Sequence, residues 1–296
     1  MQQIKKMTNK KDIKVAAVVV TYNRLQLLKE CIEALRNQTY KNLDLVIINN
    51  GSTDETKEYL DAQADVKAIH QENLGGAGGF YAGTKYAYDN GYEWIWMMDD
   101  DGLPANNQLE ELLKAADKHQ KKVLNALVVS KTDPTRLAFC TQAKLADLDM
   151  TADITDKMYC PFNGTFIHRS VMDKVGFIKK EMFIWGDEQE YRQRMMKAGY
   201  TPYTVNKAIH YHPDEKGQKG YALPFIKKGG LLIKPPHLSH YYYRNLYYLY
   251  KNYFGILSIC KIMTYYTIYY TVNNNIPELK KFYKYFRRGM KDNYKD

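Results

Sequence analysis

Apolar and polar stretches alternate along the first 130 residues as they do in chains of alternating strands and helices. Residues 13–20 (IKVAAVVV) form a β-branched run, which is typical of a strand covered on both faces. Residues 24–37 instead carry apolar side chains at the spacing of a helix. Further strands are predicted at 43–49, 66–70, 92–98 and 123–129. Further helices are predicted at 54–62, between the glycine-rich segment and about residue 90, and at 107–118. This order predicts an α/β fold in which helices flank a mostly parallel sheet.

Polar side chains stand where four of the predicted strands end. The segments concerned are 21–24 (TYNR), 49–54 (NNGSTD), 73–80 (NLGGAGGF) and 99–101 (DDD). In open α/β sheets, ligands bind beyond the carboxyl ends of the strands. We therefore expect these four segments to meet at one edge of the sheet and to form a single site.

The segment 94–102 (WIWMMDDDG) carries the most chemical information. Its apolar, aromatic part has the length of a strand, and it ends in three adjacent carboxylates and a glycine. Adjacent carboxylates repel one another, so a divalent cation bound together with a phosphate-bearing ligand is expected to hold them there. An acidic turn after a strand is the alternative interpretation.

The other strand ends offer groups that suit a nucleotide. The Thr21 hydroxyl and the Asn50 amide fit the hydrogen-bonding edge of a base, although Asn50 also fits a turn. Glycines at 75, 76, 78 and 79 predict a loop that lets the backbone approach a ligand and leads into a helix N-terminus favourable to phosphate. Their spacing matches neither GxGxxG nor GxxxxGK(S/T), which argues against a dehydrogenase and an NTPase.

The second half of the chain offers a proton acceptor. Asp187 and Glu188 fall in the first turn of a helix predicted to reach residue 197. Carboxylates there either interact with the helix dipole or take a proton from an incoming hydroxyl. A strand is predicted over 201–210, and we expect at most one of His210 and His212 to face the site. Ordinary surface histidines are the alternative.

The order of TYNR, NNGSTD, NLGGAGGF, MDDDG, WGDEQEY and HYH resembles that of family-2 glycosyltransferases with the GT-A fold, over about residues 13–213. NLGGAGGF and WIWMMDDDG are most similar to the galactofuranosyltransferase branch, with rhamnosyltransferases as close relatives. The resemblance implies a Rossmann-like GT-A domain and an inverting, metal-dependent enzyme. Such an enzyme moves a sugar from a nucleotide-diphosphate donor to a hydroxyl of a glycan or lipid-linked acceptor in surface polysaccharide synthesis. UDP-galactofuranose is the favoured donor and dTDP-rhamnose the alternative.

The resemblance also implies roles for individual residues. Mg²⁺ or Mn²⁺ would be held by Asp99, Asp101 and His212, with Asp101 as the most direct ligand. Glu188 would act as the catalytic base. The residues assigned to donor binding are Thr21, Asn23, Arg24, Asn50, Asn73, Gly75, Gly76, Asp99 and Asp100.

Two positions depart from the family's pattern. Many members have aspartate where Asn49 and Asn50 stand, so the motif does not fix which base is bound. The expected base, Glu188, is preceded by a second acid, so Asp187 stays a candidate for the same role.

From residue 237 onward the chain is rich in tyrosine. Residues 237–254 are predicted to be helical, and Arg244, Asn245 and Trp185 are candidates for acceptor binding; a helix packed on the catalytic domain is the alternative for the first two. Residues 254–272 approach transmembrane length, but a lysine and several tyrosines argue against a spanning helix. We expect a helical appendage that docks on a membrane or on a second subunit, the latter giving a homo-oligomer.

The net charge of +10 is unevenly placed, and residues 279–296 carry seven Lys or Arg and two Asp. This segment fits an anionic membrane surface, with nucleic acid or a solvated tail as alternatives. No recognised nucleic-acid-binding motif accompanies the charge, so we expect no nucleic-acid partner. The scattered cysteines form no CxxC pair, and the polar N-terminal residues have no apolar signal segment. We therefore expect a cytoplasmic protein at the inner face of the cell membrane.

The predicted organisation has four parts: an N-terminal arm (1–12), a GT-A catalytic domain (13–213), a loop or linker that can act as a lid (214–236) and a tyrosine-rich, basic helical region (237–296). Two other classes of function stay open. A sugar-phosphate nucleotidyltransferase would carry a basic, glycine-rich signature near the N-terminus, which this sequence lacks. A non-catalytic nucleotide- or glycan-binding module would tolerate loss of Glu188.

Overall fold

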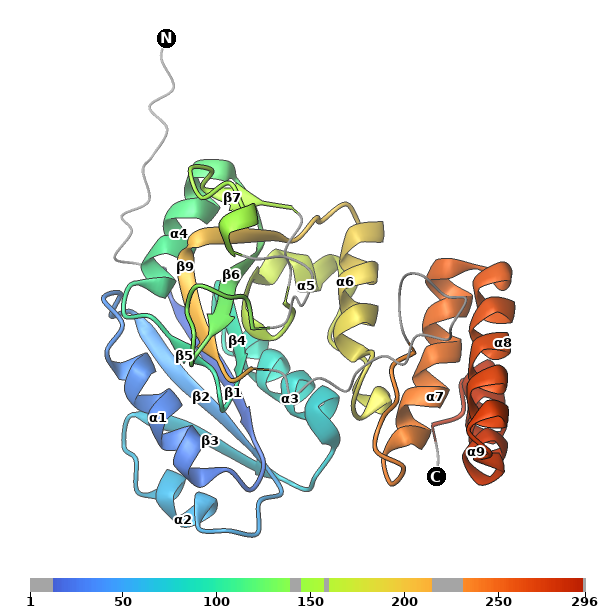
Figure 1. Ribbon diagram of the computed structural model, residues 1–296. Helices are drawn as coiled ribbons and strands as arrows, with labels where there is room; N and C mark the ends of the chain where they lie inside the picture. The colour runs from blue at the N-terminus through green and yellow to red at the C-terminus, as the bar shows by residue number, and fades with distance from the viewer. Residues whose placement is uncertain (1–12, 139–144, 157–159, 215–230, 295–296) are drawn as a thin grey trace. The chain divides into compact units, whose positions relative to one another are not determined.

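The computed structural model describes residues 13–138, 145–156, 160–214 and 231–294, which form two compact units (Figure 1). The sheet unit comprises the described residues of 1–74, 79–177 and 194–214. The helical unit comprises the described residues of 75–78, 178–193 and 215–296. The predicted N-terminal arm and most of the predicted lid lie outside the described residues. The predicted domain boundaries stay a prediction.

Nine strands of the described chain form one sheet in the sheet unit. Their bounds are β1 Val15–Thr21, β2 Leu43–Asn50, β3 Val66–Gln71, β4 Trp94–Asp99, β5 Leu103–Pro104, β6 Val123–Ser130, β7 Ile154–Thr155, β8 Asn163–His168 and β9 Tyr203–His212. The order across the sheet is β3-β2-β1-β4-β8-β6-β9-β5, and β7 pairs with β9. The long pairs β1–β2, β2–β3, β1–β4 and β6–β9 are parallel, while β8 runs antiparallel between β4 and β6. The prediction of an α/β fold with a mostly parallel central sheet is confirmed.

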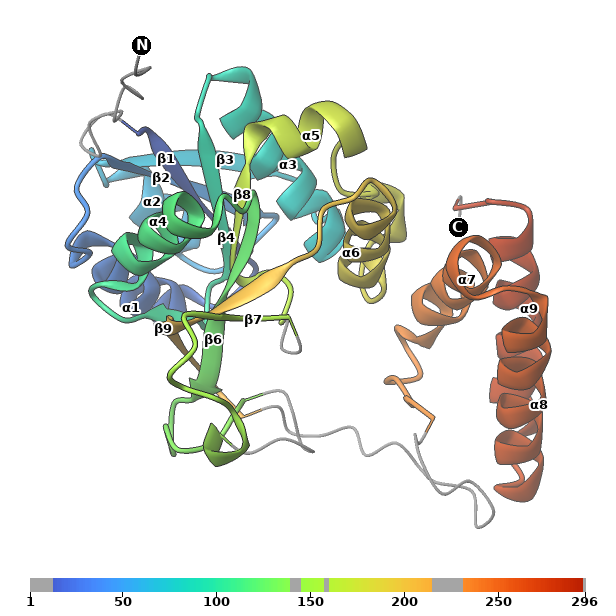
Figure 2. The same cartoon turned by 90° about the horizontal axis from the view of Figure 1, so that it is seen from above.

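Helices cover both faces of this sheet. Their bounds are α1 Leu25–Arg36, α2 Thr56–Asp61, α3 Gly75–Asp89, α4 Gln108–His119 and α5 Arg169–Val175, and a 3-10 turn lies at Leu145–Asp147. The 3-10 turn at Lys180–Met182 and most of α6 (Asp187–Lys197) belong to the helical unit. The odd-numbered residues of β1 pack with α1 and α4 in one core cluster. The even-numbered Val18 and Val20 instead face Gly83 and Gly79 of α3. Because side chains alternate along a strand, α3 lies on the face opposite α1 and α4 (Figure 2).

The glycine-rich segment is helical from Gly75 onward, so the prediction of a loop is wrong. A Cβ atom added at Gly79 or Gly83 would overlap with the methyl groups of Val20 or Val18. Glycine has a low intrinsic helix propensity, which made a loop the expected structure. The close approach of α3 to β1 requires glycine at these two positions, and this packing outweighs the propensity.

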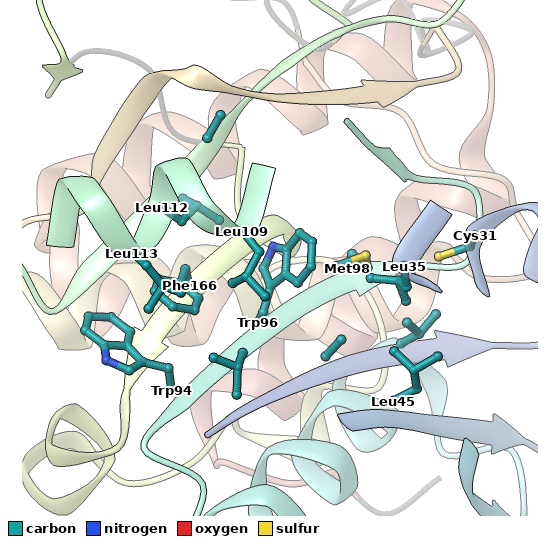
Figure 3. Close-up of a cluster of buried hydrophobic side chains, with 14 of the residues drawn as sticks. Cys31, Leu35, Leu45, Trp94, Trp96, Met98, Leu109, Leu112, Leu113 and Phe166 are labelled. Atoms are coloured by element: carbon teal, nitrogen blue, oxygen red, sulfur yellow. The ribbon is translucent and has the colours of Figure 1, made fainter. Parts of the chain in front are cut away.

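The core between the sheet and helices α1 and α4 fixes the position of β4 (Figure 3). Trp94 stacks on Phe166 with ring centroids 4.3 Å apart, and Trp96 and Met98 follow along the same face of β4. Burial of each large apolar side chain stabilises the fold by roughly 1.5–3 kcal/mol. The three aspartates therefore follow a strand that is firmly held in place.

The helical unit contains α7 (Ser239–Leu249), α8 (Ile256–Val272) and α9 (Ile276–Met290), with a π-helix at Tyr250–Phe254. Tyr243, Tyr266 and Phe282 pack against one another in its core. The helices predicted for the C-terminal region are thus confirmed. Among the helices that the structure describes, none combines the length and the apolar composition needed to cross a membrane.

Candidate functional site

The carboxyl ends of several strands meet at one edge of the sheet, as expected. In the parallel pairs, Thr21 of β1 lies opposite Asn49 of β2, and Val20 lies opposite Asp99 of β4. Strand β9 runs in the same direction as β4, because β8 is antiparallel to both β4 and β6 and β9 is parallel to β6. The last residue of β9, His212, therefore lies at the same edge as the aspartates.

Asp99, Asp101 and His212 each bring one potential ligand atom to within 4.8 Å of the others. His212 Nδ1 lies 2.7 Å from the carbonyl oxygen of Pro213, and Nε2 lies 3.1 Å from Asp101 Oδ1. The hydrogen bond at Nδ1 orients the ring so that Nε2 points toward the carboxylates. Two carboxylates and one imidazole suit Mn²⁺ or Mg²⁺, so the residues fit the cation expected from the sequence. Binding of a cation here stays a prediction.

The charges in this cluster shift one another's pKa values. Burial raises the pKa of Asp101, but the hydrogen bond and charge of His212 and the charge of Arg24 outweigh it and hold that pKa below its ordinary value. Burial lowers the pKa of His212, but the hydrogen bond and charge of Asp101 raise it above its ordinary value. Asp101 and His212 therefore stabilise each other's charged forms.

The middle aspartate binds the end of β1 instead of joining this cluster. Asp100 is buried, and its Oδ2 accepts a hydrogen bond from the Thr21 hydroxyl at 2.7 Å. Its Oδ1 lies 3.2 Å from Arg24 Nη1. Burial raises the pKa of Asp100 to about 6, with Thr21 and Arg24 opposing the shift. Thr21 and Asp100, both expected to contact the donor, thus bind each other, and their contact with a donor stays a prediction.

Asparagine side chains connect the loops at this edge. Asn23, whose φ of 53° lies in the left-handed region that asparagine tolerates, accepts a hydrogen bond from the Thr53 backbone N–H at 2.7 Å. The Asn50 side-chain oxygen accepts one from the Leu74 N–H at 3.2 Å, and its Nδ2 donates to Asn73 Oδ1 at 3.3 Å. These predicted donor-binding residues therefore fix the shape of the loops on which they lie.

His210 is fully buried against the turn that contains the aspartates. Its Nδ1 lies 3.2 Å from Gln108 Oε1, and a Cβ atom at Gly102 would overlap with Nε2. Burial lowers the pKa of His210 to about 3. We expected at most one of His210 and His212 to face the site because we took the two side chains to point to opposite faces of the strand. That reason is wrong, since residues two apart on a strand share a face. The sequence signal for this contact is Gly102, whose missing side chain leaves room for the imidazole.

The two candidate bases open α6, as predicted, and both belong to the helical unit. Asp187 is 3% exposed, whereas Glu188 is partly exposed and its Oε2 accepts a hydrogen bond from the Gly186 N–H at 3.3 Å. The preceding Phe183 and Trp185 have φ values of 65° and 62°. Non-glycine residues in this region cost about 1–3 kcal/mol each and cluster at functional sites. The catalytic role of either acid stays a prediction.

Arg244 and Asn245 bind the backbone of residues 181–185, the segment that contains Phe183 and Trp185. Asn245 is fully buried, and its Nδ2 donates to the carbonyl oxygens of Met182, Ile184 and Trp185 at 2.8, 3.1 and 2.9 Å. Arg244 is also buried and donates to the carbonyl oxygens of the same segment. These contacts favour a structural role for both residues. Of the three acceptor candidates, Trp185 is the one that is partly exposed.

Comparisons with known proteins identify the family. The sequence model of glycosyl transferase family 2 matches residues 16–176, which is more than half of the chain. This chain belongs to glycosyl transferase family 2. Galactofuranosyltransferase GlfT1 of Mycolicibacterium smegmatis is 32% identical to it over 213 residues, covering 67% of this chain and 70% of that protein. The expected similarity to the galactofuranosyltransferase branch is thus confirmed.

Solved structures resemble this glycosyltransferase in fold. TarS of Staphylococcus aureus in complex with UDP superposes with a TM-score of 0.53 and 15% identity, covering 82% of this chain and 67% of that one. Mannosyltransferase PcManGT of Pyrobaculum calidifontis, in complex with GDP-Man and Mn²⁺, superposes with a TM-score of 0.50 and 16% identity. The superposition covers 79% of this chain and 62% of that one. At such identities the likeness concerns the fold alone, and it confirms the GT-A fold. Family membership also supports a glycosyltransferase over the nucleotidyltransferase and the non-catalytic module considered from the sequence.

Proposed function

We propose that this glycosyltransferase transfers galactofuranose from UDP to a hydroxyl of a glycan or lipid-linked acceptor, with inversion, in surface polysaccharide synthesis. The observation that carries the proposal is the convergence of Asp99, Asp101 and His212 at the edge where the strands end. The similarity to GlfT1 favours galactofuranose as the sugar, and the complex of TarS with UDP favours a uridine nucleotide. A dTDP-rhamnose donor is the alternative.

Mg²⁺ or Mn²⁺ is the proposed cofactor, with Asp99, Asp101 and His212 as ligands. Such a cation, when bound, stabilises the negative charge that develops on a departing diphosphate. Asp101 presents a carboxylate whose pKa is held below its ordinary value by His212 and Arg24, so the charged form is favoured. The Mn²⁺ in the PcManGT structure supports this class of cation.

Glu188 is the proposed base. It takes the proton of the acceptor hydroxyl while the hydroxyl oxygen bonds to the anomeric carbon. The bond between that carbon and the diphosphate oxygen breaks in the same displacement, and attack from the opposite face inverts the configuration. Asp187 is the second candidate, but its burial limits access by an acceptor.

The loops after β1, β2 and β3 are the proposed donor site. Asn23, Asn50 and Asn73 shape these loops through the hydrogen bonds described above. Gly75 and Gly76 begin α3, whose N-terminus favours a phosphate group. A Cβ atom added at Gly76 would meet no atom within 4 Å, so its surroundings are open.

A donor screen tests this function. The full chain is incubated with UDP-galactofuranose, other UDP-sugars or dTDP-rhamnose, each with Mn²⁺, Mg²⁺ or a chelator, and release of the nucleoside diphosphate is measured. We expect cation-dependent release that is fastest with UDP-galactofuranose. Fastest release from dTDP-rhamnose would select the alternative donor, and no cation-dependent turnover with any donor would contradict the function.

We also propose that the helical unit contacts the inner face of the cell membrane. Its α9 exposes Lys280, Lys284 and Arg287, and the start of α8 exposes Ile256 (67%) and Leu257 (82%). Exposed basic side chains and exposed apolar side chains are the two features by which peripheral helices bind anionic bilayers. Self-association through the same helices is the alternative.

A further inference from the structure

We infer that Arg24 competes with the divalent cation for Asp101 and then binds the donor diphosphate, so that it couples the binding of cation and donor. The inference rests on the proposed function; the family resemblance already implied donor binding by Arg24, and the competition with the cation is the new element. Arg24 stands directly before α1, at the end of β1. Its Nη1 lies 3.0 Å from Asp101 Oδ2 and 3.2 Å from Asp100 Oδ1.

Asp101 has a nitrogen-bearing side chain within reach of each of its oxygens. Oδ2 faces the Arg24 guanidinium, and Oδ1 faces His212 Nε2 at 3.1 Å. A divalent cation ligated by Asp101 must come within about 2.0–2.6 Å of one carboxylate oxygen. At that position it would repel the guanidinium strongly, because like charges a few ångströms apart in a partly buried site are poorly screened. The cation and the Arg24 guanidinium therefore compete for the Asp101 carboxylate.

Arg24 is exposed enough for its side chain to move away from Asp101. Its side chain is 51% exposed, compared with 16% for the Asp101 side chain and 3% for that of Asp100. The flexible three-carbon stem lets the guanidinium move while the backbone stays fixed by β1 and α1. The two carboxylates cannot follow it, because the turn that carries them is buried against β1 and β9.

The donor supplies a new partner for the displaced guanidinium. A diphosphate bound at this edge of the sheet would offer phosphate oxygens to the displaced guanidinium. Guanidinium groups bind phosphate in a bidentate, charge-assisted manner. Arg24 thus opposes the cation when no donor is present and stabilises the complex once the diphosphate arrives. By linkage, the donor must then tighten cation binding by the same factor as the cation tightens donor binding.

Two binding constants with opposite expected changes test this inference. Mn²⁺ binding to the purified full chain is measured by the spectroscopic signal of free Mn²⁺, with and without UDP, and UDP binding is measured by calorimetry at saturating Mn²⁺. We expect Arg24→Gln to bind Mn²⁺ alone more tightly and UDP in the presence of Mn²⁺ more weakly, each by about fivefold or more. Arg24→Lys keeps the positive charge, so it should bind Mn²⁺ about as weakly as the original chain does.

The matched control is Arg36→Gln, which removes an arginine from the other end of α1 that pairs with Asp65 at 2.7 Å. It should leave both constants unchanged. Weaker Mn²⁺ binding by Arg24→Gln would overturn the inference, because it would mean that Arg24 only holds the carboxylates in place. Unchanged constants in Arg24→Gln would overturn it as well, while leaving the proposed function intact. Failure of the original chain to bind Mn²⁺ would instead overturn the proposed cation site and, with it, this inference.

Discussion

At the scale of single residues, exposure separates the two acids that open α6. Glu188 is partly exposed, and Asp187 is buried. If Glu188 removes the proton from the acceptor, Glu188→Gln should lower kcat by about 10²–10⁴-fold, which is the usual contribution of a general base. Steady-state kinetics with saturating donor and acceptor measures this change.

Two further variants make that comparison decisive. Gln189→Ala changes an exposed neighbour on the same helix and should leave kcat unchanged. Asp187→Asn should lower kcat less than Glu188→Gln does. A larger loss in Asp187→Asn, together with near-normal turnover in Glu188→Gln, would assign the base to Asp187.

Some of the residue contacts at the site followed from the sequence and others did not. The grouping of Asp99, Asp101 and His212 was expected from the family motif, and strand ends that meet at one edge allow it. The contact between Asp100 and Thr21 was not expected, because the direction of a side chain depends on packing that a motif does not encode. Likewise, nothing in the motif indicated that Arg24 would bridge two of the aspartates.

At the scale of elements, the start of α5 depends on a neutral histidine. His168 Nδ1 accepts a hydrogen bond from the Ser170 N–H at 3.2 Å and so caps the helix. Burial, aided by the charges of Lys122 and Arg169, lowers the pKa of His168 below its ordinary value near 6.5. As the pH falls through 6.5, the unfolded chain takes up this proton before the folded chain does, so folding stability falls. Above that pH the contribution is fully present.

The variant His168→Asn isolates this effect, since asparagine also caps helices but does not titrate. Thermal unfolding is followed at pH 7.5 and pH 5.5 for both chains. The original chain should lose more stability on acidification than the variant does. Equal losses would show that His168 has the same pKa in the folded and unfolded states.

The contact between α3 and the sheet predicts opposite effects for two glycines of one helix. A Cβ atom at Gly83 would overlap with Val18, so Gly83→Ala should destabilise the fold by about 1–3 kcal/mol through overpacking. Gly76→Ala meets no atom within 4 Å and should stabilise the helix by about 0.5–1 kcal/mol. The midpoint of thermal unfolding measures both. A Gly83→Ala midpoint at or above that of the original chain would contradict the packing described here.

Most strands and helices were predicted to within two or three residues, because their apolar periodicity is regular. Strand β1, predicted at 13–20, spans Val15–Thr21, and α4, predicted at 107–118, spans Gln108–His119. The beginning of α3 was missed for a physical reason. The spacing of its glycines reflects contact with β1, and a contact between segments distant in the sequence has no local signature.

At the scale of the whole molecule, the helical unit is predicted to carry the membrane contact. Each basic residue near an anionic bilayer contributes about 1 kcal/mol, so the double variant Lys280→Glu, Lys284→Glu should bind phosphatidylglycerol-containing vesicles far more weakly. Vesicle flotation measures bound protein. Replacing Ile256 and Leu257 by glutamate should weaken binding as well, because both side chains are largely exposed.

The control for this experiment is Lys207→Glu, which changes an exposed basic residue of β9 in the sheet unit. It should float like the original chain. If the original chain does not float with anionic vesicles but sediments as a dimer, the exposed residues of α8 and α9 serve a second copy and the membrane proposal is wrong.

The central claim is that the carboxylates after β4 hold the cation on which sugar transfer depends. Its most direct test is a Mn²⁺ titration of the chelator-treated enzyme, following UDP release from UDP-galactofuranose in the original chain, Asp101→Asn and Asp89→Asn. Asp89 is an exposed aspartate that pairs with Lys85 and serves as the control. We predict saturable activation by Mn²⁺ in the original chain and in Asp89→Asn, and a loss of at least about 100-fold in Asp101→Asn. Full turnover without a divalent cation, or unchanged activation in Asp101→Asn, would contradict the claim.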